Sequence, residues 1–174
     1  EARVNSKSRT IIAKENVYGA FLKKGDNESV KIEVLVDELK YFSYNKKTYL
    51  IGDVILRRKD DVIYADKIEL ENDKNIVTIK GDFRIESEEY QASANYMIID
   101  LDNDSAELID NVSIYRPAEN NVSANIDSRE KEIRGLASWI TADYVKQKEL
   151  ENDESVTIIS GNVVIKQIDK TLKG

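Results

Sequence analysis

The chemistry open to this chain is limited by two residue types that it lacks. Its 174 residues contain no histidine and no cysteine. Without histidine the chain has no Ser-His or Cys-His nucleophile pair and lacks the commonest general base and metal ligand. Without cysteine it has no disulfide, no thiolate chemistry, no Cys-ligated zinc and no iron–sulfur cluster. Among the residue types that remain, the carboxylates are the candidates to weigh for catalysis or metal binding.

Carboxylates are abundant, but their spacing is typical of turns. They cluster at Asp60-Asp61, at Asp100, Asp102 and Asp104, and at Asp153-Glu154. A glycosidase needs two carboxylates held at a fixed separation in a cleft. The segment 102–104 resembles the start of a calcium loop, but it lacks the glycine and the distal glutamate of an EF-hand. These clusters separate apolar runs, as turn residues do. We therefore expect no catalytic residue, no metal site, no cofactor and no enzymatic activity.

The overall composition indicates a folded, acidic protein. Basic residues number 26 and acidic residues 33, so the net charge is −7, which disfavours nucleic-acid binding. Apolar residues make up 41% of the chain, too many for a disordered protein. No apolar run approaches the ~20 residues of a membrane-spanning helix, so we expect no transmembrane segment. With one proline and no linker-like stretch, we expect a single domain over residues 1–174.

Short runs rich in Val and Ile alternate with polar residues and are separated by Asn/Asp clusters, a pattern that predicts an all-β fold. The segment from Ser29 to Tyr44 is the one competitor for a helix, but its alternation favours a strand. The spacing of the runs predicts about fourteen to sixteen strands.

The strands belong to an internal repeat. A block of the form Gly-Asx-apolar-x-apolar, where Asx is Asp or Asn, begins at Gly52, Gly81, Asp110 and Gly161. A second block, Ala-Asx, follows at Ala65, Ala94 and Ala124, and Ala142 is of the same type. The period is 29 residues in the middle of the chain. Each unit is thus a pair of strands with a variable turn between them.

The alternation within a unit predicts which side chains point inward. Positions two and four residues after the first residue of the Gly-Asx block are apolar in every unit, and those two and four residues before it are apolar except for Thr48 and Thr157, so they share one face of a strand. At Ala-Asx the alternation shifts by one residue, which predicts a bulge or a sheet corner. The glycine lies on the inward phase, where a missing side chain permits close backbone approach. An array with one apolar face can close as a solenoid, a jelly roll or a twisted two-sheet roll.

These blocks carry a resemblance to a known family. The segments 52–82 and 156–167 resemble the repeat of the OstA/LptA-like β-jelly roll, the periplasmic lipopolysaccharide-transport module of LptA, LptC and the N-terminal part of LptD. The resemblance is best over residues 36–174. The chain departs from the pattern where Asp110 replaces the glycine, where Pro117 interrupts the third unit, and where the fourth unit is shortened between Gly135 and Ala142.

The resemblance implies an all-β, two-sheet jelly roll without catalysis. It implies that acyl chains of lipopolysaccharide lie in an apolar slot while the sugars and phosphates stay in water. It also implies a periplasmic location, with a signal peptide or membrane anchor removed, and edge-strand pairing with other Lpt-type jelly-roll proteins or with another copy. Because Leu172 and Gly174 fall where another second strand would begin, we expect a truncated C-terminus or an open sheet edge.

The candidate lipid-binding residues are those on the inward phase. They are Val54, Leu56, Ile63, Ile68, Val77, Ile79, Phe83, Ile85, Met97, Val112, Ile114, Val163 and Ile165. Taken alone, such residues are ordinary core. The basic run Arg57, Arg58 and Lys59 directly follows an inward strand, so it is the candidate for head-group contacts at the rim of the slot, although such runs are more often solvated strand ends.

Two alternatives remain open at the level of the sequence. The chain could be an LptC-type or N-terminal LptD-type member of the same machinery. It could also be a structural β-solenoid or adhesin-like stalk with a filled core. The interior distinguishes a carrier from a stalk, because a carrier has an open apolar groove and a stalk has no void larger than a water molecule.

Overall fold

The computed structural model describes residues 1–24, 29–58, 61–118, 136–150 and 154–168. Within these residues eleven antiparallel strands form one bent sheet. The strands are β1 (Ala2–Asn5), β2 (Thr10–Lys24), β3 (Ser29–Phe42), β4 (Lys47–Arg58), β5 (Asp61–Glu71), β6 (Ile76–Glu86), β7 (Gln91–Asp100), β8 (Ser105–Arg116), β9 (Ala137–Glu149), β10 (Ser155–Ser160) and β11 (Val164–Ile168). The all-β prediction is confirmed, including a strand over most of the segment from Ser29 to Tyr44.

The strands are neighbours in the order in which they occur in the chain. β1 to β10 pair consecutively, and β11 returns to pair with β9. β10 pairs with the second half of β9, from Tyr144 to Glu149, whereas β11 pairs with its first half, from Ala137 to Thr141. β10 and β11 therefore act as two halves of one long bent strand, broken at the Gly161-Asn162 block.

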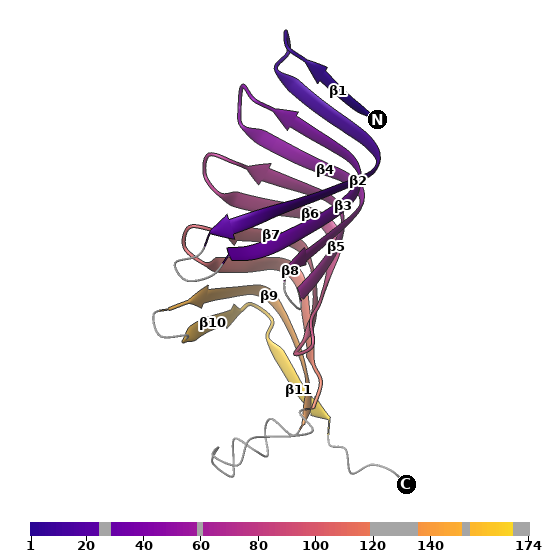
Figure 1. Cartoon of the computed structure of the whole chain (residues 1–174). Helices are drawn as coiled ribbons and strands as arrows, with labels where there is room; N and C mark the ends of the chain where they lie inside the picture. The colour runs from indigo at the N-terminus through magenta and orange to yellow at the C-terminus, as the bar shows by residue number, and fades with distance from the viewer. Residues whose placement is uncertain (25–28, 59–60, 119–135, 151–153, 169–174) are drawn as a thin grey trace.

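The long strands bend in the middle, and this bend gives the sheet its shape. Every pairing from β2–β3 to β8–β9 shifts register at mid-strand. The shift falls at the repeated blocks, for example between Ile51 and Val54 in β4 and between Ala65 and Ile68 in β5. The predicted bulge or corner at Ala-Asx is confirmed. Figure 1 shows the strands turning at the right-hand side of the view, so that one sheet becomes two facing arms.

The Gly-Asx blocks adopt a backbone conformation that ordinary residues avoid. Gly52 and Asp53 have φ angles of 80° and 40°, and Asp110 and Asn111 have φ angles of 62° and 52°. Gly, Asn and Asp tolerate this left-handed region best, which explains why Asp110 can replace the expected glycine. At some blocks glycine is also required because a neighbouring side chain lies too close to leave room for a Cβ atom. A Cβ atom on Gly52 would lie 2.7 Å from Asp37 Oδ2, whereas one on Gly81 would meet nothing within 4 Å.

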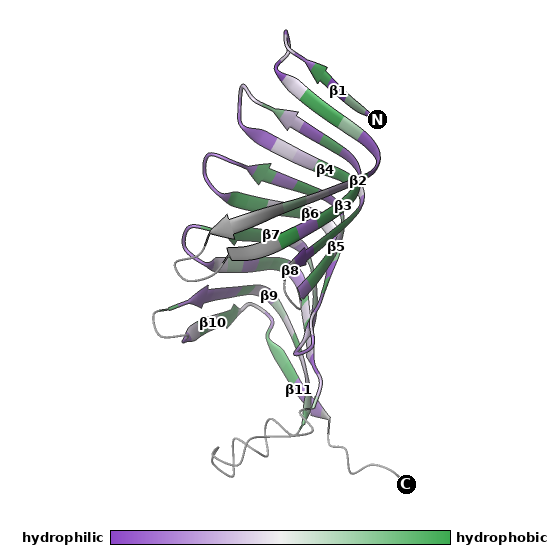
Figure 2. Cartoon of the chain, in the orientation of Figure 1, coloured by the Kyte–Doolittle hydropathy of each residue, from purple (hydrophilic) through white to green (hydrophobic). Residues whose placement is uncertain are grey.

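The inner face of the bent sheet is the hydrophobic core. In one cross-strand ladder, Leu50 pairs with Ile68, Ile68 with Ile79, Ile79 with Met97, Met97 with Leu108 and Leu108 with Val145. All six side chains are buried. Figure 2 shows apolar bands crossing the strands while the turns at the left-hand strand ends are hydrophilic. The core therefore runs along the inside of the roll, across its strands.

The outer face is polar and aromatic. Lys47 Nζ lies 2.6 Å from Glu69 Oε1 and 3.3 Å from Glu71 Oε1, and the hydrogen bond to Glu69 is the main cause that raises the pKa of Lys47. Lys67 lies over the ring of Tyr49 at 5.2 Å from its centroid. Pairs at a solvated surface such as these contribute little to stability. The outer face is thus a solvated surface, and the inner face positions the candidate site.

Two details of the repeat differ from the sequence-based expectation. The described residues hold eleven strands instead of about fourteen to sixteen, because one continuous strand passes through each bend where the run spacing suggested two. Ala142 of β9 lies opposite Val112 of β8 and so takes the Ala-Asx slot of the third unit. Ala124 and Gly135, which the sequence pattern assigned to repeat blocks, lie outside the described residues.

The bend predicts a graded response to alanine at three glycines. In Gly52→Ala, an alanine must adopt a left-handed backbone conformation, and its Cβ atom meets Asp37. In Gly81→Ala, the alanine must adopt the left-handed conformation but its Cβ atom meets nothing, and at Gly19 neither constraint applies. We expect the free energy of unfolding to fall by about 2–3 kcal/mol for Gly52→Ala and about 1–2 kcal/mol for Gly81→Ala. Gly19→Ala is the matched control and should change it little. Urea denaturation measures all three, and equal losses would contradict this account of the bend.

Candidate functional site

A cavity of about 400 Å³ opens between the two arms of the sheet. Its walls are apolar side chains of the inner face. They are Ile32, Leu56, Ile63, Leu70, Val77, Ile79, Ile85, Met97, Ile99 and Ala106, with Leu101 from the turn after β7. A close-packed protein interior contains few voids larger than a water molecule. The cavity is in the size range of ligand sites, so the geometry favours a carrier over a stalk with a filled core.

The cavity is long and narrow. Its lining residues come from every strand between β3 and β9. Because neighbouring strands lie about 4.8 Å apart, seven adjacent strands extend over about 29 Å. A volume of about 400 Å³ spread along such a length describes a slot that crosses the strands, and its shape suits an extended hydrocarbon chain better than a compact molecule.

Two tight turns frame the mouth of the slot. In the turn between β6 and β7, Ser87 Oγ accepts hydrogen bonds from the backbone N–H groups of Glu89 at 3.1 Å and Tyr90 at 3.2 Å. In the turn between β7 and β8, Asp100 Oδ1 accepts from the N–H groups of Asp102 and Asn103. These bonds hold the turns in fixed shapes, as Asx-type turns do. The mouth is therefore defined by local hydrogen bonds.

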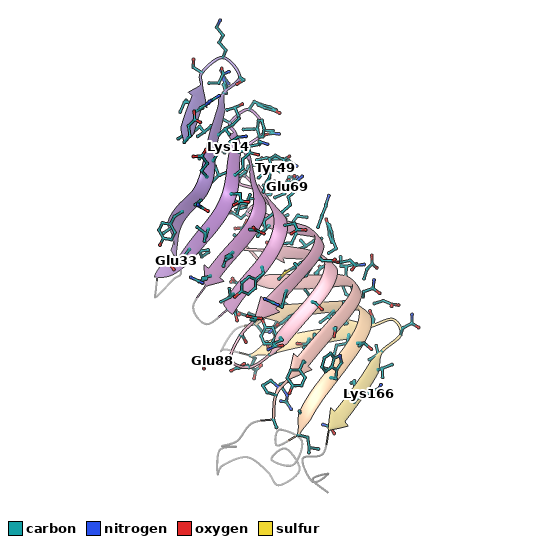
Figure 3. The ribbon with its side chains drawn as sticks, turned by 90° about the vertical axis from the view of Figure 1, so that its right-hand side faces the viewer. Lys14, Glu33, Tyr49, Glu69, Glu88 and Lys166 are labelled. Atoms are coloured by element: carbon teal, nitrogen blue, oxygen red, sulfur yellow. The ribbon has the colours of Figure 1, made fainter. Side chains whose placement is uncertain are left out.

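The mouth is acidic. Six of the described residues that line the cavity carry carboxylates, and none of these described residues is Lys or Arg: Asp61, Glu88, Glu89, Asp100, Asp104 and Glu149. The hydrogen bond from the Asn103 side chain is the main cause that lowers the pKa of Asp100, so this carboxylate remains ionised at neutral pH. Figure 3 shows Glu88 at one edge of the ribbon, apart from Tyr49 and Glu69 of the outer face.

The structure divides the thirteen predicted lining residues into three groups. Six of them line the cavity: Leu56, Ile63, Val77, Ile79, Ile85 and Met97. Five fill the core or pack against it without reaching the cavity: Val54, Ile68, Phe83, Val112 and Ile114. The remaining two, Val163 and Ile165, have exposed fractions of 43% and 59%. The parity argument thus located the inner face, but it did not separate slot from core.

Val163 and Ile165 are exposed because they lie at the end of the roll. Ile165 pairs with Ile140, and Ile140 pairs with Ile114, so Ile165 continues an inward ladder. Within the described part of the chain no further strand follows β11 to cover it. Val163 and Ile165, expected among the lipid-binding residues of the inward face, thus do not line the cavity, and their role in lipid binding stays a prediction. The pairing of Ile165 is consistent with its predicted inward orientation.

Of the basic run expected at the rim, only Arg57 has a described side chain. Arg57 pairs with Glu33 and Val62 and is exposed on the outer face, directly after the inward Leu56. It does not line the cavity. Arg58 pairs through its backbone with Asp61 and Ile32, but its side chain lies outside the described structure, as does Lys59 altogether. Arg57 therefore lies apart from the lining of the slot, and head-group contacts of all three residues stay predictions.

A second, shallower hollow of about 620 Å³ lies on the outside of the bend. Its polar lining includes Tyr64, Arg84 and three aspartates, Asp53, Asp66 and Asp82, and the guanidinium of Arg84 lies 4.7 Å from the ring centroid of Tyr64. This hollow is open to solvent and ringed by charges, so it suits an apolar ligand less well than the slot. Sequence reasoning missed both this hollow and the acidic mouth.

Neither a metal centre nor a membrane-spanning helix occurs in the described part of the chain. No group of three or more acidic side chains there could hold a metal ion. No helix there is long and apolar enough to cross a bilayer. The slot is accordingly the strongest candidate for a functional site in the described residues, and its chemistry is that of apolar binding.

A bent antiparallel sheet with an apolar slot between its arms defines a protein of the β-jelly-roll type. Comparison with known families is specific: residues 33–133 match the family described as LptA/(LptD N-terminal domain) LPS transport protein. This match spans more than half of the 174 residues. The chain therefore belongs to this family of lipopolysaccharide-transport proteins, and the family resemblance of its sequence is confirmed.

The fold has a solved counterpart. The chain is similar to LptH from Pseudomonas aeruginosa, described as the LptA-homologous periplasmic component of the lipopolysaccharide transport device, with a TM-score of 0.50 and 13% sequence identity. The likeness covers 74% of this chain and 94% of LptH. At this identity it shows the fold, which is the predicted LptA-like β-jelly roll. A search of curated protein sequences found no significant match.

The distinction between core and slot predicts unequal costs of truncation. Ile68 is fully buried and does not reach the cavity, whereas Ile99 lines the cavity and is half-buried. We expect Ile68→Ala to lower the free energy of unfolding by about 2–5 kcal/mol and Ile99→Ala by about 1 kcal/mol, because Ile99 has fewer packing partners to lose. Chemical denaturation of the two variants tests this, and equal losses would indicate that the slot is filled core.

Proposed function

We infer that this protein binds acyl chains of lipopolysaccharide in the slot between its two arms and carries them across the periplasm toward the outer membrane. The observation that carries the proposal is an apolar slot of about 400 Å³ in a chain that belongs to a family of lipopolysaccharide-transport proteins. The slot takes the acyl chains, and the sugar and phosphate groups stay outside its mouth.

The physical chemistry of the slot supports this function. Each methylene group moved from water into an apolar site contributes roughly 0.8 kcal/mol, whatever the identity of the chain. A slot lined by Ile, Leu, Val and Met therefore binds hydrocarbon without needing directed polar contacts. Met97 adds a flexible side chain that can adapt to chains of different shape. No general base, thiol or metal is required.

The edges of the sheet support a role as one link in a longer assembly. We propose that β1 at one end, and β10 and β11 at the other, pair with other Lpt-type jelly-roll proteins or with another copy of this chain. Val156, Ile158 and Ile165 near the second edge have exposed fractions of 46%, 54% and 59%. Apolar side chains on an uncovered edge favour addition of a strand, which would extend the slot from one protein to the next.

Photo-crosslinking tests the proposal directly. A photoreactive amino acid at position 85 would point into the slot, whereas one at position 84, on the same strand, would point to the outer face, because Ile85 lines the slot and Arg84 is exposed. We expect adducts with purified lipopolysaccharide at position 85 and none at position 84. Equal adducts at both positions, or none at 85 in a folded protein, would contradict the proposed site.

A charged residue in the slot should abolish much of the binding. In Ile85→Glu a carboxylate would have to lose its water to admit an acyl chain, which opposes binding. We expect the affinity for lipopolysaccharide to fall at least about tenfold, or about 1.4 kcal/mol. Arg84→Glu is the matched control on the outer face and should bind as the unaltered protein does. Affinity can be measured by fluorescence titration after circular dichroism has confirmed the fold of both variants.

A further inference from the structure

The described residues at the mouth of the slot carry a charge opposite to the one expected for a phosphate-binding rim. The six carboxylates of the lining come from both sides of the opening. Glu88 and Glu89 belong to the turn that joins β6 and β7. Asp100 and Asp104 flank the turn that joins β7 and β8, and Glu149 ends β9. A head group held beside the slot would therefore meet negative charge on either side.

Two of these carboxylates project from a well-ordered turn. The hydrogen bonds of Ser87 in this turn involve the backbone of Glu89 and Tyr90 and leave the carboxylates out. Glu88 and Glu89 are exposed, and within the described part of the chain neither carboxylate forms an ion pair or a hydrogen bond. Their charge is thus directed to the mouth and is not neutralised by a neighbouring side chain of that part.

The other lip is negative for a different reason. Asp104 offers its backbone carbonyl to the N–H group of Glu149 at a distance of 3.0 Å, which ties the end of β9 to this turn. The hydrogen bonds from Asn103 and Asp102 lower the pKa of Asp100, so they favour the charged form that an aspartate already has at neutral pH. The acidic residues of this lip are consequently held together by the backbone, near the apolar wall formed by Ile99, Leu101 and Ala106.

We propose that the acidic mouth makes the slot selective for amphiphiles that carry positive charge next to their acyl chains, and that it disfavours a bare phosphate at that place. The positive charge can come from amine groups on the head group or from divalent cations bound to its phosphates. This proposal rests on the proposed function, because it specifies the head group of the lipid that occupies the same slot. Charge complementarity sets which partner is admitted more than how tightly it is held.

Three amphiphiles with the same twelve-carbon chain test the proposal: dodecyltrimethylammonium, dodecyl maltoside and dodecyl phosphate, each below its micelle concentration. We expect the affinity of the full chain to fall in that order at low salt, by about tenfold between the cationic and anionic amphiphiles. In 0.5 M NaCl the difference should shrink, because salt screens exposed charges. Isothermal titration calorimetry measures each affinity.

Magnesium distinguishes the two sources of positive charge. Dodecyl phosphate is titrated once with Mg²⁺ and once with EDTA. A gain of affinity with Mg²⁺ supports admission of phosphates that carry a divalent cation. If Mg²⁺ has no effect while the ammonium amphiphile still binds most tightly, the amine source is supported. Equal affinity for all three amphiphiles, with or without Mg²⁺, would overturn the proposal.

A charge-reversed variant separates the mouth from the net charge of the protein, which is −7. In Glu88→Lys/Glu89→Lys the preference for the cationic amphiphile should vanish or reverse. The matched control, Asp66→Lys/Asp82→Lys, makes the same change in net charge at exposed residues on the outside of the bend, and it should keep the preference. An equal effect of both variants would assign the preference to overall charge and overturn the proposal.

The outcomes also separate this proposal from the function on which it rests. If the amphiphiles bind, if Ile85→Glu weakens them, and if charge has no influence, the acidic mouth has no selective role but the apolar slot stands. If none of the amphiphiles binds, or if Ile85→Glu changes nothing, both the selectivity and the lipid-carrying function fail.

Discussion

The structure depends on one constraint: each long strand must bend in the middle without losing its neighbours. A bend in one strand would break the ladder on both sides unless the adjacent strands bent at the same level. The register shifts of β4, β5, β6, β7 and β8 lie side by side, so the bends stack into a continuous corner. The Gly-Asx and Ala-Asx blocks alternate along this corner, and a bulge at each block absorbs the extra residue.

The corner explains why the interior is full on one side and hollow on the other. Next to the bend the two arms are close, and Val36, Val54 and Val112 are each only 1% exposed. Small residues such as Ala65 and Ala94 stand on either side of Phe83 there, which lets the large ring fit between the arms. Farther from the bend the cavity is lined by Leu56 and Ile85 of one arm and by Val77 and Ile99 of the other. The slot is thus the space that a corner of fixed angle leaves open.

The sequence predicts those features that are written in the alternation of each strand. Inward positions were identified correctly at Val54, Ile79 and Ile85, because burial on one face of a sheet follows a period of two. The same alternation places Arg57, five residues after Gly52, on the outer face. The sequence alone therefore indicates that the side chain of Arg57 points away from the slot. Other features depend on contacts in the folded structure, which the alternation within one strand does not predict. The exposure of Ile165 depends on which strand follows β11, and the direction of Glu88 depends on the hydrogen bonds of its turn.

The contrast between walls and mouth fits the task of a carrier better than that of a storage protein. Apolar walls attract any hydrocarbon chain in proportion to the area that it buries, so they cannot choose among lipids. Charges at a mouth act at the moment of encounter and set which head groups approach. In this protein the walls are built from the repeat, whereas the charges are built from the turns at its open side. Because turn residues can change without disturbing the corner, the selectivity of such a slot can vary while its fold is maintained.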